Sequence, residues 1–301
     1  MLVPPPPLHL IDAHVHLMTP ERIASGLRWI RRVVPEYSAL SGDVTADDLL
    51  ADLRAAGAGA VFSFFYPLQG GESVVINRWQ RDLAGRRPEV VAFASVHSDD
   101  DRPAEVVATA FEDLNLAGLK LHPYVQGLDP LDRRLARALA VVEESGRPLV
   151  LHTGFSGFYG RDPLTGAVDE ILRRYPRLRL VAAHLLYGDL PLSRWAERLE
   201  AHPNLYLDAT NVLSLARPGT SEGAQLSALL ADWSHRVTFG TDYPMGMAYP
   251  VDCLYSLPAA IAPGPDALED LSWRTAARLV GPSCLPPSIA RDLALNPAPP
   301  P

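Results

Sequence analysis

Cysteine is scarce in this chain, and long apolar runs are missing from it. Only Cys253 and Cys284 occur among 301 residues, which excludes a disulfide framework. No apolar run reaches the roughly 18 residues that a membrane-spanning helix needs. The run Pro4–Pro7 stands where a signal peptide would have its apolar core. We therefore expect a soluble cytoplasmic protein with reduced thiols.

A surplus of positive charge is also absent. The 27 basic residues are outnumbered by 35 acidic ones, and the formal net charge is -8. This balance argues against a general nucleic-acid binder or a protein that binds membrane surfaces. The expected partner is a small molecule, and a locally basic pocket for an anionic substrate stays open.

Short apolar runs alternate with segments of helical character. The predicted strands are Leu8–His14, Gly59–Phe65, Val90–Val96, Ala117–His122, Pro148–His152, Leu178–His184, Asn204–Asp208 and Arg236–Thr241. The predicted helices are Ala46–Ala56, Ser73–Ala84, Pro103–Leu114, Pro130–Ser145, Thr165–Tyr175, Leu192–Ala201, Ser221–Trp233, Val251–Ala260 and Asp266–Val280. Such Val-, Leu- and Ala-rich strands are typical of strands buried on both faces. The alternation predicts an α/β fold, a single (β/α)8 TIM barrel across residues 1–301.

An open, doubly wound sheet is the alternative architecture. It lacks support because no Gly-x-Gly-x-x-Gly follows an early strand and no P-loop occurs. Residues 17–45 read as a long connection without an assigned element. The proline-rich ends, residues 1–7 and 296–301, are expected to be extended or disordered tails.

Two histidines, His14 and His16, end the first predicted strand. Because side chains alternate along a strand, both imidazoles point to the same face, where they can bind one metal ion. A His-x-His pair alone is weak evidence. In a TIM barrel, however, the C-terminal strand ends build the active site, and several other strands end in residues of the same type.

Most of the predicted site residues share this position at or just after a strand. They are His14, His16, Lys120, His122, His152, His184 and Asp242. Each one alone would most often be an ordinary core, surface or turn residue. Together they place more titratable groups at one face than a structural role requires. We therefore predict a metal site there, for one or two ions of Zn2+, Mn2+ or another divalent metal.

With these residues in place, the chain resembles the amidohydrolase superfamily of metal-dependent enzymes, and most closely its amidohydrolase-2 branch. The resemblance spans nearly the whole chain. The motifs that carry it are Asp12-Ala13-His14-Val15-His16, Gly118-Leu119-Lys120-Leu121-His122-Pro123, His152-Thr153-Gly154, His184 and Gly240-Thr241-Asp242-Tyr243-Pro244. It implies a (β/α)8 barrel whose metal site lies at the C-terminal face.

The resemblance also implies roles for single residues. His14, His16 and His152 match metal ligands, and Asp242 matches the acid that binds metal and handles the proton of an attacking water. His184 matches a second-metal ligand in binuclear relatives, and a catalytic acid/base or oxyanion stabiliser in mononuclear ones. Lys120 matches a lysine that CO2 converts to a carbamate bridging two metals. Without that modification, Lys120 would be an ammonium that holds a substrate carboxylate or pairs with an acid.

The connection after the fifth predicted strand combines glycines, which allow movement, with aromatic residues. We predict substrate contacts for Phe155, Tyr159 and Arg161 in this loop, and for His122. Such a set fits an aromatic or cyclic substrate that carries an anionic group.

Three functions remain open. The first is metal-dependent hydrolysis of a C–N or C–O bond in an amide, cyclic amide or lactone. The second is non-oxidative decarboxylation of an unsaturated or aromatic acid, which related members of the branch carry out. The third is a metal-bearing barrel that binds or assembles without turnover. Homodimers are common in such enzymes, but the sequence leaves the oligomeric state open.

Overall fold

The computed structural model describes residues 7–34, 40, 43–246 and 250–296. Of the predicted tails, only residues 7 and 296 fall within these ranges. The strands are β1 (Ile11–Val15), β2 (Ala60–Ser63), β3 (Val90–Ala92), β4 (Ala94–Ser95), β5 (Leu119–Leu121), β6 (Leu149–His152), β7 (Leu180–Ala183), β8 (Leu205–Asp208) and β9 (Val237–Thr238). All of the strand pairs among these residues are parallel, as the βα alternation requires.

The nine strands lie in the orders β1-β2-β3 and β4-β5-β6-β7-β8-β9. Only Phe93 separates β3 from β4, and its N–H donates to Ser63 O on β2. On the other side, Ala94 N–H donates to Gly118 O, directly before β5. The predicted strand Val90–Val96 is therefore one strand with a break, and it joins the two groups.

A second seam joins β1 to the chain after β9. Ala13 N–H donates to Phe239 O at 2.8 Å, and Asp242 N–H donates to His14 O at 2.8 Å. A parallel bridge between Val15 and Tyr243 continues the same ladder. These contacts close the strands into a TIM barrel, as predicted.

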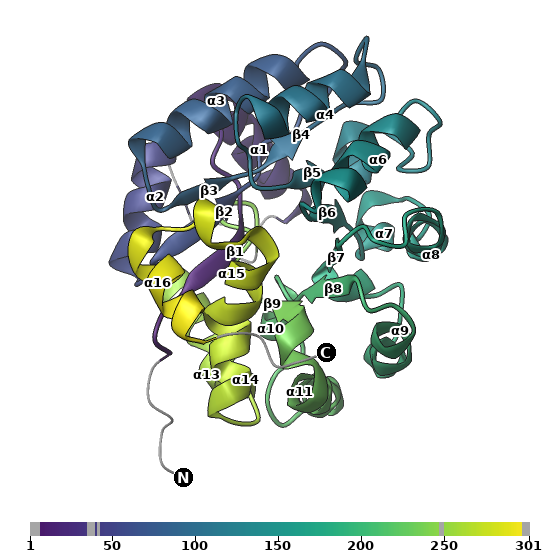
Figure 1. The fold of residues 1–301 in the computed structure, drawn as a ribbon. Helices are drawn as coiled ribbons and strands as arrows, with labels where there is room; N and C mark the ends of the chain where they lie inside the picture. Colours follow the sequence, from purple (N-terminus) through teal and green to yellow (C-terminus); the bar gives the residue numbers. More distant parts are fainter. Residues whose placement is uncertain (1–6, 35–39, 41–42, 247–249, 297–301) are drawn as a thin grey trace.

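Helices surround the strands (Figure 1). The longer ones are α1 (Pro20–Val33), α2 (Ala46–Ala55), α3 (Ser73–Arg86), α4 (Pro103–Glu112), α6 (Ala136–Ser145), α8 (Thr165–Arg174), α9 (Trp195–Ala201), α11 (Ser221–Trp233), α15 (Thr275–Val280) and α16 (Pro287–Leu295). Short helices are α5 (Pro123–Gln126), α7 (Ser156–Tyr159), α10 (Val212–Leu215), α12 (Val251–Tyr255), α13 (Leu257–Ile261) and α14 (Pro265–Glu269). The 3-10 turns are η1 (His184–Leu186), η2 (Leu192–Arg194), η3 (Ser234–Arg236) and η5 (Pro282–Cys284), and η4 (Asp270–Arg274) is π-helical. None of the helices in the described part of the chain is long and apolar enough to span a membrane.

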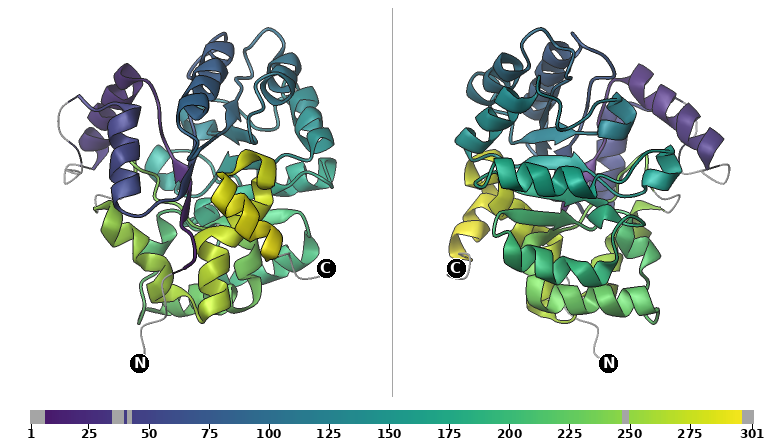
Figure 2. Two further views of the ribbon diagram at one scale, coloured as in Figure 1. Left: turned by 60° about the vertical axis from the view of Figure 1, so that its left-hand side comes forward. Right: turned by 90° about the vertical axis from the view of Figure 1, so that its right-hand side faces the viewer.

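Two of the longer helices, α1 and α16, lie where the sequence predicts none. Helix α1 lies within the predicted connection 17–45 and begins at Pro20. Its residues Ile23, Leu27 and Ile30 are buried along one stripe of the helix. Helix α16 lies beyond the predicted end of the barrel. Figure 2 shows α1 (purple) and α16 (yellow) on opposite sides of the barrel.

The predicted helix Asp266–Val280 consists of three consecutive helical segments, α14, η4 and α15. The predicted helix Pro130–Ser145 begins only at Ala136, as α6. The barrel interior and the inner faces of α15 and α16 form one apolar cluster, while a larger cluster fills the space between strands and outer helices.

Helix α16 supports a stability prediction. Ile289 is 1 % exposed, and its Cδ1 lies close to Gly59 at the entry to β2. We expect Ile289→Ala to lower the free energy of unfolding by about 2–4 kcal/mol, because it leaves a cavity in the barrel floor. Leu295→Ala on the same helix, at a side chain that is 73 % exposed, should change it by less than about 0.5 kcal/mol. Urea unfolding of both variants checks this, and equal effects would show that α16 does not seal the barrel.

Candidate metal centre

The strand ends bring the predicted ligands to one place. His14 lies on β1 and is fully buried. Its Nδ1 is 2.6 Å from Asp208 Oδ2 at the end of β8. The contact makes Nδ1 the protonated nitrogen, so the lone pair of Nε2 faces the interior of the site. There it meets Lys120 Nζ at 3.3 Å and Asp242 Oδ1 at 3.5 Å.

His16 is oriented in the same way. Its Nδ1 lies 3.2 Å from Phe64 O, an acceptor, so this nitrogen donates and Nε2 carries the lone pair. That Nε2 lies 2.9 Å from Asp242 Oδ1. A carboxylate and an imidazole lone pair repel each other at this distance, so the contact requires a proton or a cation between them.

His184 and His152 complete the set. His184 Nδ1 lies 3.1 Å from Thr210 O, and its Nε2 lies 3.1 Å from His152 Nδ1. His152 Nε2 is buried and has no hydrogen-bond partner among the described residues. A buried ring nitrogen without a partner is expensive, and a metal ion is one way to satisfy it.

The chemistry of this donor set fits a divalent metal. Burial lowers the pKa of His14 and His152 well below the ordinary value and that of His184 to about 4, which favours neutral rings with one lone-pair nitrogen each. Ligand atoms of His14, His184 and Asp242 lie within 4.8 Å of one another. Neutral imidazoles beside a carboxylate are the ligands that Zn2+ and Mn2+ accept in proteins.

Asp242 stays ionised in this setting. Burial raises the pKa of its carboxyl group, but the contact with His16 and the proximity of His184 and Lys120 outweigh burial and hold the pKa at about 2. Asn211 Nδ2 donates to Oδ2 at 2.9 Å. Asp242 and His184 both have positive φ, 64° and 62°, conformations that L-residues rarely adopt outside functional sites.

Lys120 is fully buried on β5. Burial lowers the pKa of its amine to about 8, although the carboxylates of Asp208 and Asp242 act in the opposite direction. The amine also lies 4.8 Å above the ring of Phe64. Burial therefore favours the neutral amine of Lys120, the form that reacts with CO2.

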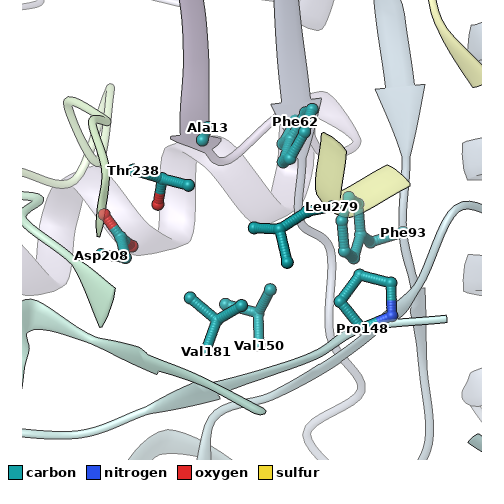
Figure 3. Close-up of a pocket in the computed structure, with 9 residues that line it drawn as sticks. All are labelled: Ala13, Phe62, Phe93, Pro148, Val150, Val181, Asp208, Thr238 and Leu279. Carbon is teal, nitrogen blue, oxygen red and sulfur yellow. The ribbon is translucent and has the colours of Figure 1, made fainter. Parts of the chain in front are cut away.

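The floor of the site is apolar (Figure 3). A cavity of about 10 Å³ lies inside the barrel and is lined by Ala13, Phe62, Phe93, Pro148, Val150, Val181, Asp208, Thr238 and Leu279. Apolar surroundings explain why burial raises the pKa of Asp208 to about 7, against the hydrogen bonds that it accepts from Thr210. The ionisable side chains of the site therefore lie next to a largely apolar layer of the barrel interior.

Above the ligands lies an open cavity of about 970 Å³. His122 stacks on His152, with ring centroids 3.6 Å apart and planes at 13°. Tyr159 lies edge-on to both rings and also stacks on Tyr124. Tyr66 stands near His122 and closes the wall on that side.

The predicted substrate contacts are not all in this cavity. His122, Phe155 and Tyr159 line it, whereas Arg161 is exposed and is not among the residues that line it. Arg22 and Trp29 belong to the connection that the sequence places on the mouth side of the barrel; they line the cavity, but from a helix, α1, that the sequence did not predict. Asp208 ends β8 and Asn211 follows it, and by hydrogen bonds they hold His14 and Asp242.

Fold and site together define a class: a TIM-barrel protein with a candidate divalent-metal centre at the C-terminal ends of its strands. The sequence profile of the family described as Amidohydrolase matches residues 11–281, and the chain belongs to this amidohydrolase-2 family. No curated protein matches the chain in a sequence comparison.

Solved structures share the fold. An uncharacterised TIM-barrel protein from Bordetella bronchiseptica is 21 % identical, covers 94 % of this chain and 100 % of its own, and has a TM-score of 0.66. 5-Carboxyvanillate decarboxylase from Sphingomonas paucimobilis is 16 % identical over 91 % and 99 %, with a TM-score of 0.64. A putative 2-pyrone-4,6-dicarboxylic acid hydrolase from Pseudomonas putida is 18 % identical over 91 % and 97 %, with a TM-score of 0.63.

The assigned ligands lead to a direct prediction. We expect His14→Ala and Asp242→Ala to lose most of the bound metal while the protein stays folded, because each removes a donor from a site whose framework is the barrel. His202→Ala, a histidine outside the site, serves as the matched control. Elemental analysis and circular dichroism check this. Wild-type metal content in both site variants would end the assignment.

Proposed function

We propose that the protein is a metal-dependent hydrolase that cleaves a C–N or C–O bond in a small amide, cyclic amide or lactone. The observation that carries the proposal is the ionised carboxylate of Asp242 beside the inward-facing nitrogens of His14 and His16. A carboxylate in this place can accept the proton of an attacking water and pass it to the leaving group.

The proposed ligands are His14, His16, His152, His184, Lys120 and Asp242. A bound divalent cation would supply a Lewis acid that lowers the pKa of water and polarises a substrate oxygen. With one ion, His184 would be left for acid/base work or for stabilising negative charge on the substrate oxygen. With two ions, His184 and a carboxylated Lys120 would both be ligands.

Family membership supports a divalent metal in general, and a 5-carboxyvanillate decarboxylase from Novosphingobium aromaticivorans has been solved with bound manganese. Zn2+ remains our first candidate, and Mn2+ the second. The proposal includes a cytoplasmic location, which the free thiols of Cys253 and Cys284 suit.

The cavity supports a planar, anionic small-molecule substrate. Its walls are aromatic near the ligands, where flat rings can stack. Arg22 lines the cavity, and its Nη2 pairs with Glu72 at 3.1 Å. Its Nη1 is buried without an acceptor among the described residues. A substrate carboxylate could supply this acceptor and would gain a charge-assisted hydrogen bond.

Decarboxylation of an unsaturated or aromatic acid is the second candidate. The aromatic walls and Arg22 favour it as well, because they fit an aromatic carboxylate. In that reaction the bond to CO2 breaks and a proton takes its place on carbon. A metal-bearing barrel without turnover is the third possibility, and the open cavity above the ligands argues against it.

Metal removal tests all three. We expect a chelator to abolish turnover and Zn2+ or Mn2+ to restore it. Products are then followed for lactones, cyclic amides and aromatic acids: a new carboxylate without CO2 indicates hydrolysis, and released CO2 indicates decarboxylation. Turnover that survives confirmed metal loss contradicts both enzymatic candidates. Stoichiometric metal with no turnover of any of these substrates favours the binding module.

Arg22 can be tested separately. We expect Arg22→Met to lower kcat/KM for anionic substrates by about tenfold to a hundredfold, since a hydrogen bond to a charged group contributes about 1.5–3 kcal/mol. Neutral esters of the same acids should lose much less. Arg28→Met, at an exposed position of the same helix, is the matched control. An equal loss on acids and esters would remove Arg22 from substrate recognition.

A further inference from the structure

One buried carboxylate, that of Asp12, has no role in the proposed chemistry. It lies on β1, is fully buried, and accepts hydrogen bonds on both oxygens. Oδ1 accepts from the N–H groups of Thr241 at 3.0 Å and His14 at 3.2 Å. Oδ2 accepts from the hydroxyls of Thr241 at 2.6 Å and Tyr255 at 3.0 Å. Four donors on one buried carboxylate fix its position and theirs.

The donors come from both sides of Asp242. Thr241 directly precedes it in the chain, and Tyr255 ends α12 further on. The backbone N–H of Asp242 donates to His14 O on β1 at 2.8 Å, and its carbonyl accepts from Met245 N–H at 2.7 Å within the turn. Asp12 therefore holds the segment that carries the proposed ligand at two points.

The backbone at Asp242 needs such support. Its φ of 64° is an unfavourable conformation for an aspartate in the absence of restraint. Gly246 packs so closely that a Cβ there would lie 2.3 Å from Thr241 O and 2.8 Å from Asp242 Cβ. Gly246 thus packs directly against the Thr241–Asp242 turn, and Asp12 restrains the same turn by two hydrogen bonds from Thr241.

We propose that Asp12 is a positioning residue that holds the Thr241–Asp242 turn and thereby sets where the Asp242 carboxylate stands relative to His14 and His16. The inference rests on the proposed function, because it takes Asp242 as a metal ligand. Asp12 is not one of the proposed ligands and does not line the cavity; it acts through Thr241, Tyr255 and the backbone N–H of His14.

The experiment measures metal affinity by competition between the apo-protein and a zinc-binding dye, which requires no substrate. Asp12→Asn keeps the shape but replaces one acceptor oxygen by an N–H donor that faces other donors. We expect it to weaken zinc binding about 10- to 100-fold, the usual effect of changing a group that orients a ligand. Tyr255→Phe, which removes a single donor, should weaken it less.

A matched pair at Thr241 keeps the test decisive if Asp12→Asn does not fold. Thr241→Ser retains the hydroxyl and should bind zinc close to wild type, whereas Thr241→Val removes it at nearly the same volume and should bind weakly. Asp52→Asn is the control: Asp52 accepts from Tyr243 in the same segment but does not touch Thr241. Its zinc affinity should not change.

The outcomes separate the two proposals. Wild-type protein that does not bind zinc or manganese refutes the proposed function itself. Wild-type protein that binds zinc, with equally tight binding in the folded Asp12→Asn and Thr241→Val variants, overturns only the role of Asp12. A fall in the unfolding midpoint without loss of zinc affinity gives Asp12 a purely structural role and also overturns it.

Discussion

The contact between His16 Nε2 and Asp242 Oδ1 is the constraint on which the site depends. Both atoms are acceptors once His16 donates its Nδ1–H to Phe64 O. Two acceptors at 2.9 Å in a buried place are stable only with positive charge between them. The fold supplies the restraints that bring them together, and a proton or a metal cation between them would remove the repulsion that this creates.

The same logic extends to the neighbouring groups. Asp208 orients His14 and the carbonyl of Thr210 orients His184, so both imidazoles keep Nε2 for the interior of the site. Because Asp208 ends β8 and Thr210 follows it, the orientation of these two rings depends on a strand that provides none of the proposed ligands. The apolar floor beneath Asp208 strengthens each of these interactions by excluding water.

The order of the strands and the grouping of the candidate ligands could be predicted because both follow from two simple rules. Buried parallel strands read as short apolar runs, and parallel strand ends meet at one face, which groups His14, Lys120, His152, His184 and Asp242 without knowledge of any contact. Closure between β1 and the chain after β9 follows from the same topology. What these rules do not contain is the pairing of side chains between elements far apart in sequence.

The less predictable features depend on such pairings. The segment of α1 is rich in arginine, and its three buried residues become a stripe only when the barrel rim is present to cover them. Arg161 follows two aromatic residues in the chain, but the left-handed turn at Gly160 directs the segment after it along the surface. The positive φ of Asp242 and the role of Asp12 arise from packing around a single turn, for which the local sequence holds no pattern.

The arrangement of the cavity has a consequence for how such a protein can change. The proposed ligands belong to the barrel strands and the turns at their ends, whereas much of the outer wall belongs to α1, a single helix inserted between β1 and α2 and meeting α7 through Trp29 and Tyr159. Part of the proposed recognition surface is therefore encoded in a stretch of sequence that contains none of the proposed ligands. Substitutions within one fourteen-residue helix can alter which molecules enter without moving any atom that would hold the metal.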